Sequence, residues 1–315
     1  REHGLYVGKA LDLMANTDVP CPQLAMQLQL ALGSLSYHAV GGAFQSGAAF
    51  DDARRLAEQC QDLSGQLRAI SGHLAVNLCS GRYGEALAQS QQFDRLDPRT
   101  DPLLGVSNQR LQVLAQHYTG NQILARQNAE QVLQRMAHSG HLNRFAHGIG
   151  VQYDQCVASL TVLARILWLQ GYAERAWRTA RQALELAQQI NHGTSICYTL
   201  ALAGVVIARY NGDQAAAQSL QALLLEQSHK HGVQLFQTWA AHYAGILTGN
   251  DLQGLGLIDD ILITLGASDV DEHGEARARS GAAGWCAPEV LRVNAEQRLR
   301  QGDTLAAETL LQEAI

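Results

Sequence analysis

Apolar and polar residues recur with helical spacing over residues 158–190, in two consecutive segments. The first, ASLTVLARILWL, is almost continuously apolar. In the second, alanines and larger apolar residues fall on one side, whereas Arg175, Arg178 and Glu185 fall on the other, which is the pattern of an amphipathic helix. Gly171 stands between the segments, where glycine adopts a left-handed turn at little cost. The stretch therefore predicts a helical hairpin.

The same junction recurs along the chain. Six glycines are each followed five residues later by a small residue, in the pairs Gly81 and Ala86, Gly120 and Ala125, Gly171 and Ala176, Gly212 and Ala217, Gly249 and Gly254, and Gly302 and Ala307. A small residue is expected there because a helix that packs closely on its partner leaves no room for a long side chain. Irregular intervals of 39, 51, 41, 37 and 53 residues separate the glycines, as in a two-helix repeat with variable loops. Strand patterns are almost absent, so we expect an all-α solenoid.

We expect the whole chain, residues 1–315, to form a single helical-repeat domain. Its parts are looser repeats over 1–80, better-defined repeats over 81–266, a polar linker over 267–283 and a final hairpin over 284–315. The linker is predicted because acidic and then basic residues occur there without an apolar stripe. We also predict a flexible turn over 41–47 and a longer loop over 138–152. The chain begins without methionine and stops within a helical pattern, which suggests a fragment of a longer protein.

Composition and charge exclude several functions. The net charge of -6 and the isoelectric point near 6.0 argue against direct nucleic-acid binding, because phosphate neutralisation needs a clustered basic surface. No apolar run approaches the roughly 20 residues that span a bilayer, and the first residues lack the apolar stretch of a signal peptide. Six cysteines without metal-ligand spacing predict reduced, mostly buried thiols. We therefore expect a cytoplasmic protein without membrane contact.

The residues at these junctions also resemble those of a known helical repeat. Gly-x-Tyr-x-x-Ala at 81–86 matches the turn of the tetratricopeptide repeat, as do Gly171, Ala176 and Ala183. The segments ASLTVLARILWLQGYAERAWRTARQALELA, SICYTLALAGVVIARYNGDQAAAQ and GWCAPEVLRVNAEQRLRQGD resemble the C-terminal helical-repeat domain of large bacterial signalling ATPases. In that family a winged-helix or nucleotide cyclase domain and then a nucleotide-binding switch domain precede the repeats. The resemblance covers nearly the whole chain and implies a right-handed α-solenoid without catalytic residues. The family usually has another hairpin before WCAPE, where this chain has the polar linker.

Catalytic and metal-binding patterns are weak. No GxxxxGK[ST] phosphate loop occurs, so the chain has no recognisable ATPase site. Asp259 and Asp260 resemble the acidic metal-binding motif of terpenoid synthases, but Ile263 stands where the third carboxylate would be, and we interpret them as a solvated face. Three histidines share one predicted loop without a partner at ligand spacing; they are His138, His141 and His147. We expect no catalytic residue, metal or cofactor.

The inner face of the solenoid remains as a candidate binding surface. In tetratricopeptide arrays the first helix of each hairpin lines this concave face, about thirteen, ten, six and three residues before the junction glycine. Arginines and large aromatic residues collect at these positions; the candidates are Arg110, His117, Arg165, Trp168, Arg209, Phe236, Trp239, Tyr243 and Arg292. Arginine offers forked donors to carboxylate or phosphate, and aromatic rings offer rigid contact area. Such a groove suits an acidic peptide, a protein segment or a small anionic effector. The alternative is that these are ordinary solvated or interhelix residues.

Three functional hypotheses follow. The first is a non-enzymatic sensory and protein-interaction module of a bacterial signalling ATPase, a transcriptional regulator. Its concave face would bind a partner or effector and bias the ATPase switch domain of the same full-length chain. The second is a structural scaffold that forms homo-oligomers and has no ligand groove. The third is an all-α enzyme that uses Asp259 and Asp260.

Overall fold

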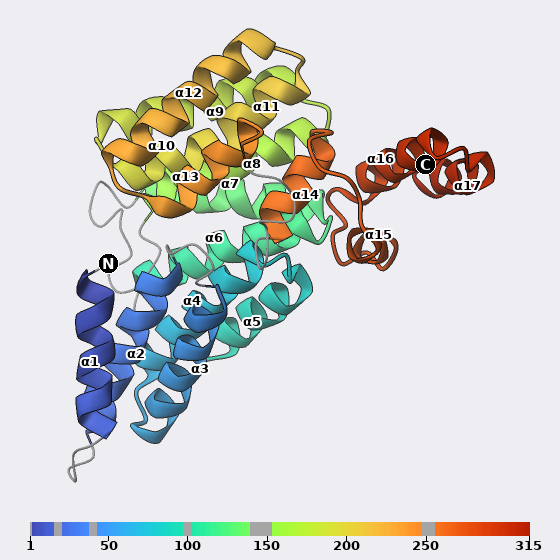
Figure 1. Cartoon of the computed structure of the whole chain (residues 1–315). Helices are drawn as coiled ribbons and strands as arrows, with labels where there is room; N and C mark the ends of the chain where they lie inside the picture. The colour runs from blue at the N-terminus through green and yellow to red at the C-terminus, as the bar shows by residue number, and fades with distance from the viewer. Residues whose placement is uncertain (1, 16–20, 38–42, 97–101, 139–152, 247–255) are drawn as a thin grey trace.

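The computed structural model describes residues 2–15, 21–37, 43–96, 102–138, 153–246 and 256–315, and every regular element in these ranges is helical (Figure 1). The elements are α1 (Glu2–Ala15), α2 (Pro22–Tyr37), α3 (Ala43–Gln59), α4 (Leu63–Cys79), α5 (Tyr83–Arg95), α6 (Pro102–Tyr118), α7 (Gln122–His138), α8 (Gln155–Leu169), α9 (Ala173–Gln189), α10 (Gly193–Thr199), η2 (Leu200–Gly204), α11 (Val205–Tyr210), α12 (Gln214–Lys230), α13 (Gln234–Tyr243), α14 (Gly256–Thr264), α15 (Glu272–Arg279), α16 (Ala287–Arg300) and α17 (Thr304–Glu313). The prediction of an all-α fold is confirmed.

Consecutive helices pack against each other, and alternate helices also touch. α4 packs on α5, α6 on α7, and α8 on α9, while α4 contacts α6, α6 contacts α8, and α8 contacts α10. One hydrophobic core extends from Leu74 in α4 to Leu310 in α17. This core is continuous because neighbouring helices from α4 onward bury apolar residues against one another, whereas α2 and α3 contribute to a separate cluster around Phe50.

The junction glycines adopt the left-handed conformation that the sequence predicts. Their φ angles are 77° at Gly81, 96° at Gly120, 85° at Gly171, 73° at Gly212 and 84° at Gly302. The small residue five positions later is buried in each case, at Ala86, Ala125, Ala176, Ala217 and Ala307. The sixth pair, Gly249 and Gly254, lies outside the described residues. The junctions therefore combine a glycine turn with a close helix crossing.

Two predicted irregular segments are helical instead. The flexible turn expected over 41–47 is wrong for Ala43–Gly47, which begin α3. Ser46 is buried there, and its hydroxyl donates to the carbonyl oxygen of Gly33 at 2.7 Å. The polar linker expected over 267–283 contains α15, which begins where Asp271 accepts the Gly274 N–H at 2.7 Å. A helix forms there without an apolar stripe because its buried contacts are made by small residues and by paired charges. Of the loop predicted over 138–152, residues 139–152 lie outside the described part.

Residues 193–210, which comprise α10, η2 and α11, are the most apolar helical stretch. Among the described residues this one stretch is long and apolar enough to cross a membrane, but 83% of it is buried inside the fold. The expectation that no run reaches this length therefore needs correction, although burial on this scale is typical of a core helix of a soluble protein. All six cysteines are free; Cys197 and Cys286 are buried, and Cys21 is exposed.

The C-terminal segment, defined as residues 256–286, folds back onto two hairpin turns far away in the sequence. A Cβ atom placed on Gly256 would lie 2.7 Å from the carbonyl oxygen of Ser80, and one on Gly284 would lie 2.5 Å from that of Thr119. Helix α14 contacts α4, α13 and α16. In Figure 1 it lies between the helices of the first third of the chain and those of the middle. The segment thus joins two parts of the array.

Candidate functional site

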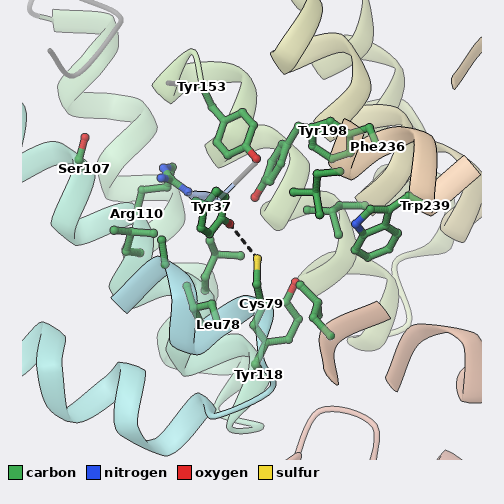
Figure 2. A pocket seen from close by; sticks show the side chains of 16 residues that line it. Tyr37, Leu78, Cys79, Ser107, Arg110, Tyr118, Tyr153, Tyr198, Phe236 and Trp239 are labelled. Carbon is green, nitrogen blue, oxygen red and sulfur yellow. Dashed lines mark hydrogen bonds between the residues drawn. The ribbon is translucent and has the colours of Figure 1, made fainter. Parts of the chain in front are cut away.

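A cavity lies among the first helices of the hairpins (Figure 2). It contains about 670 Å³ of space that no atom fills, a volume that includes open solvent. The residues that line it are Tyr37, Ala75, Leu78, Cys79, Ser107, Arg110, Leu111, Leu114, Tyr118, Tyr153, Tyr198, Leu202, Leu235, Phe236, Trp239 and Leu257. They belong to α2, α4, α6, α10, η2, α13 and α14, with Tyr153 just before α8.

Aromatic rings form much of the wall. The ring centroids of Tyr153 and Tyr198 lie 4.2 Å apart, and those of Tyr153 and Phe236 lie 6.5 Å apart. In Figure 2, Trp239 lies on the side of the cavity opposite Arg110. All of these aromatic side chains are buried. Rigid rings of this kind give a ligand large contact area at a low cost in side-chain entropy.

A π-helical turn shapes one wall. In η2 the backbone N–H of Val205 donates to the carbonyl of Leu200, which is one residue further back than in an α-helix. The hydroxyl of Tyr243 donates to the carbonyl oxygen of Ala201 within the same turn at 2.6 Å. Leu202 from this turn lines the cavity. Such turns often occur at functional sites because they shift side chains out of helical register.

Arg110 is the ionised residue of the cavity. It is 4% exposed, and its Nε–H donates to the side-chain oxygen of Gln155 at 2.8 Å. Arg110 also lowers the pKa of Tyr198 by its charge and by a hydrogen bond, although burial, the larger effect, raises that pKa overall. Among the residues that the structure describes, no carboxylate forms an ion pair with Arg110. The buried guanidinium therefore has neutral partners.

The other polar groups of the cavity stay neutral. Burial raises the pKa of Tyr153 and Tyr37 well above the usual value of a phenol. Burial also raises the pKa of the Cys79 thiol to about 11, and this thiol lies 2.7 Å from the Tyr37 hydroxyl. Protonated phenols and thiols carry no charge at neutral pH. The described residues of the wall thus do not neutralise the positive charge of Arg110.

Three of the residues proposed for the concave face come together at the cavity: Arg110, Phe236 and Trp239. Their common site follows the predicted spacing, since each precedes a junction glycine by ten or thirteen positions. Arg165 is buried nearby, but it contacts Trp285, whose ring centroid lies 4.4 Å from the guanidinium carbon, and Tyr118, whose hydroxyl accepts from it at 3.2 Å. His117 is also buried, and its Nδ1 lies 2.8 Å from Gln122 Oε1.

The remaining candidates make contacts within the fold instead of lining the cavity. Trp168 donates to Asn211 Oδ1 at 2.8 Å, and Arg209 donates to the carbonyl oxygen of Tyr243 at 2.7 Å. Tyr243 is buried beside η2. Arg292 forms ion pairs with Glu289 and Glu296 on the outside of α16. None of these four side chains lines the cavity, although the ring of Tyr243 packs edge-on against Trp239, with the ring centroids 5.8 Å apart.

The interpretation of Asp259 and Asp260 as a solvated face is wrong for Asp260, which is 2% exposed. Arg277 binds both of its carboxylate oxygens, at 2.7 and 2.9 Å, and the Tyr83 hydroxyl donates to it at 2.5 Å. Arg277 also donates to the carbonyl oxygen of Gly81 at 2.9 Å. The aspartate is buried because α14 packs beside α4, where the partners come from two other parts of the chain. We call Tyr83, Asp260 and Arg277 the clasp.

Asp259 gives a testable pH dependence. Burial and the neighbouring charge of Asp260 raise its pKa from 3.8 to about 6. The folded state therefore favours the protonated acid, so that this residue lowers stability increasingly as pH rises from about 4 to 6. We expect Asp259→Asn to raise the melting temperature at pH 8 and to have little effect at pH 4, by differential scanning fluorimetry. The control for loss of charge is Glu226→Gln, at an exposed position of α12. An increase in the melting temperature of Asp259→Asn that does not depend on pH would contradict the prediction.

Several cavity residues lie beyond the reach of the junction rule. Tyr37 belongs to α2 and Leu257 to α14, and no described junction glycine follows either helix. Tyr153 precedes α8 and lies too far from Gly171 to be counted from it. The sequence does contain a partial signal for the position of Tyr153. It directly precedes Asp154, which caps α8 by accepting the Val157 N–H at 2.8 Å, so Tyr153 lies at the start of that helix. Within the described part of the chain, no group of histidine, cysteine or acidic residues has the arrangement of a metal site.

The chain matches no protein-family model and none of the curated proteins with which it was compared.

Proposed function

We propose that this protein is a non-enzymatic sensory module, built as a right-handed solenoid of tetratricopeptide-like hairpins, that binds a ligand on its inner face. The left-handed glycines and buried alanines at successive junctions support this architecture. The stacking of α4 on α6, α6 on α8, and α8 on α10 supports an array whose first helices share one side. The cavity lies on that side.

The cavity lined by aromatic and aliphatic side chains is the observation that carries the proposal. A structural scaffold gains stability by filling such a space with side chains, because empty volume in a core is destabilising. A binding module instead leaves a concave, mostly apolar space with few polar groups. The cavity fits the second description, since among its described lining residues the ionised Arg110 lies with tyrosines and aliphatic side chains.

The resemblance to the repeats of bacterial signalling ATPases supplies the wider role. In this proposal the protein is the cytoplasmic effector-binding arm of such a regulator, and a switch domain of the full-length chain receives the signal. Leu257 of the C-terminal segment lines the cavity three residues before Asp260 of the clasp. A ligand that contacts Leu257 differently in two arrangements of the segment would shift their populations.

A neutral hydrophobic dye tests whether the cavity binds ligands. We expect N-phenyl-1-naphthylamine to bind with a stoichiometry of one per chain, measured by its fluorescence enhancement. Leu202→Trp should abolish this binding because the indole occupies the cavity. Leu225→Trp, at an exposed position of α12, should leave it unchanged.

Unchanged dye binding in Leu202→Trp would contradict the proposal, provided that the melting temperature shows a folded variant. Light scattering across a concentration series tests the scaffold alternative. Dimers that form through the inner face would exclude the dye as the molar mass rises, and this result would favour the scaffold.

A further inference from the structure

We infer that the cavity binds a small organic monocarboxylate with an aromatic body, whose carboxylate contacts Arg110. This inference rests on the proposed function and specifies the class of ligand. Its basis is the charge, the hydrogen bonding and the shape of the cavity.

The first step concerns the charge of Arg110. A buried ionised group is costly unless it is paired, and Arg110 is buried with Gln155 and Tyr198 as neutral partners. Arg277, by contrast, is paired with the carboxylate of Asp260. Arg165 is also buried without a described carboxylate, but it is stacked on Trp285 and does not line the cavity. The unneutralised charge at the cavity is therefore best matched by an anion that arrives with the ligand.

The second step concerns the donors that remain. An arginine has five N–H donors in a planar fork, and Gln155 accepts from the one at Nε. The Gln155 amide in turn donates to the carbonyl oxygen of Tyr153 at 3.1 Å, which fixes its orientation. The Tyr198 hydroxyl accepts one further hydrogen bond from Arg110, and the remaining donors on the terminal nitrogens are available for a carboxylate.

A hydroxyl one helical turn away provides a further polar group. Ser107 lines the cavity and is 1% exposed, and its Oγ has no hydrogen-bond partner among the described residues. Residues three apart lie on the same face of a helix. A buried hydroxyl without a partner is rare in folded proteins, so Ser107 is a second contact for the polar end of a ligand.

The third step concerns the net charge of the ligand and the shape of its apolar part. One guanidinium balances one negative charge, whereas a phosphate dianion would bring a second charge into an apolar space. Figure 2 places Arg110 and Trp239 on opposite sides of the cavity, with Tyr153, Tyr198 and Phe236 between them. An elongated molecule with a carboxylate at one end and an aromatic ring at the other matches this distribution.

The test compares acids with their uncharged amides. The probes are 2-naphthylacetate, indole-3-acetate, 2-naphthylacetamide, indole-3-acetamide and 2-naphthyl phosphate, with affinity measured by isothermal titration calorimetry. We expect the wild-type protein to bind each acid about tenfold to hundredfold more tightly than its amide, the range for a hydrogen bond to a charged group. Arg110→Gln should remove this preference and leave amide binding within about twofold. Arg178→Gln, on the exposed side of α9, is the control and should keep the preference.

Three results would overturn the inference while dye binding still supported the cavity. They are equal affinity of acid and amide in the wild type, a preference that persists in Arg110→Gln, and tighter binding of 2-naphthyl phosphate than of 2-naphthylacetate. If the wild-type protein binds neither the neutral dye nor the acids, the proposed function itself is rejected. The melting temperature of Arg110→Gln separates binding from folding: we expect no decrease, because the substitution removes an unpaired buried charge.

Discussion

Arg277→Met is expected to destabilise the protein by about 3–5 kcal/mol, the range for removing one partner of a buried ion pair. The substitution leaves the carboxylate of Asp260 buried with only the Tyr83 hydroxyl as a hydrogen-bond donor from the clasp. It also removes the contact of Arg277 with the Gly81 carbonyl. Urea unfolding measures the free energy, and hydrogen exchange should show faster exchange in α14 and α15.

A double variant tests the reason for this loss. Asp260→Leu combined with Arg277→Met removes both charges, so it should recover most of the stability. Recovery should stay incomplete because Tyr83 then lacks its acceptor. Arg300→Met is the control, since Arg300 pairs with Asp269 on the exposed surface and should cost less than about 1 kcal/mol. A double variant no more stable than Arg277→Met would show that the clasp acts by something other than charge pairing.

Gly120→Ala is expected to cost more stability than Gly171→Ala. Both glycines have left-handed φ angles, of 96° and 85°, and an L-residue in this region costs about 1–2 kcal/mol. A Cβ atom at Gly120 would also lie 3.1 Å from the carbonyl carbon of Gly284, whereas one at Gly171 meets nothing within 4 Å. We expect a further loss of about 1–3 kcal/mol in Gly120→Ala from this close contact, measured by urea unfolding.

Gly284→Ala separates the loss of stability caused by the close contact from the loss caused by the left-handed backbone conformation. Its Cβ atom would lie 2.5 Å from the carbonyl oxygen of Thr119, and its φ angle is outside the left-handed region. We expect this variant to weaken the docking of the C-terminal segment and to shift the emission of Trp285, which packs against Arg165. Equal losses in Gly120→Ala and Gly171→Ala would contradict a role for the backbone contact between the two segments.

These contacts give the C-terminal segment two tasks. Through the clasp and the glycine contacts it fastens to the turns after α4 and α6, and through Leu257 it completes the cavity wall. The same short helix, α14, carries Leu257 and Asp260. In the proposed sensory module, helix α14 therefore connects the cavity to the contacts that hold the C-terminal segment in place.

Local sequence determined much of the architecture. The spacing of apolar residues predicted helices because a helix has 3.6 residues per turn, and junction glycines predicted the turns because only glycine adopts the left-handed region at little cost. The alanine five residues after each described glycine predicted a close crossing and is buried.

The site was predictable only in part. Counting back from a junction glycine selected Arg110, Phe236 and Trp239, which line one cavity. The same count selected Trp168, Arg209 and Arg292, which contact residues of the protein itself. Helical register places a side chain on a face, but the neighbours on that face come from other hairpins. Whether an arginine meets a carboxylate, a ring or a cavity therefore does not follow from its own helix.

The sequence by itself determined the helices and their glycine turns, because these depend on residues a few places apart. Tertiary structure alone decided that Asp260 pairs with Arg277 at the turn of Gly81 and that Arg110 has Gln155 as its partner. It also placed Tyr37, Tyr153 and Leu257 in the same cavity. Such groups are distant in the sequence, and the charge and burial of each depend on contacts that form only when the hairpins stack.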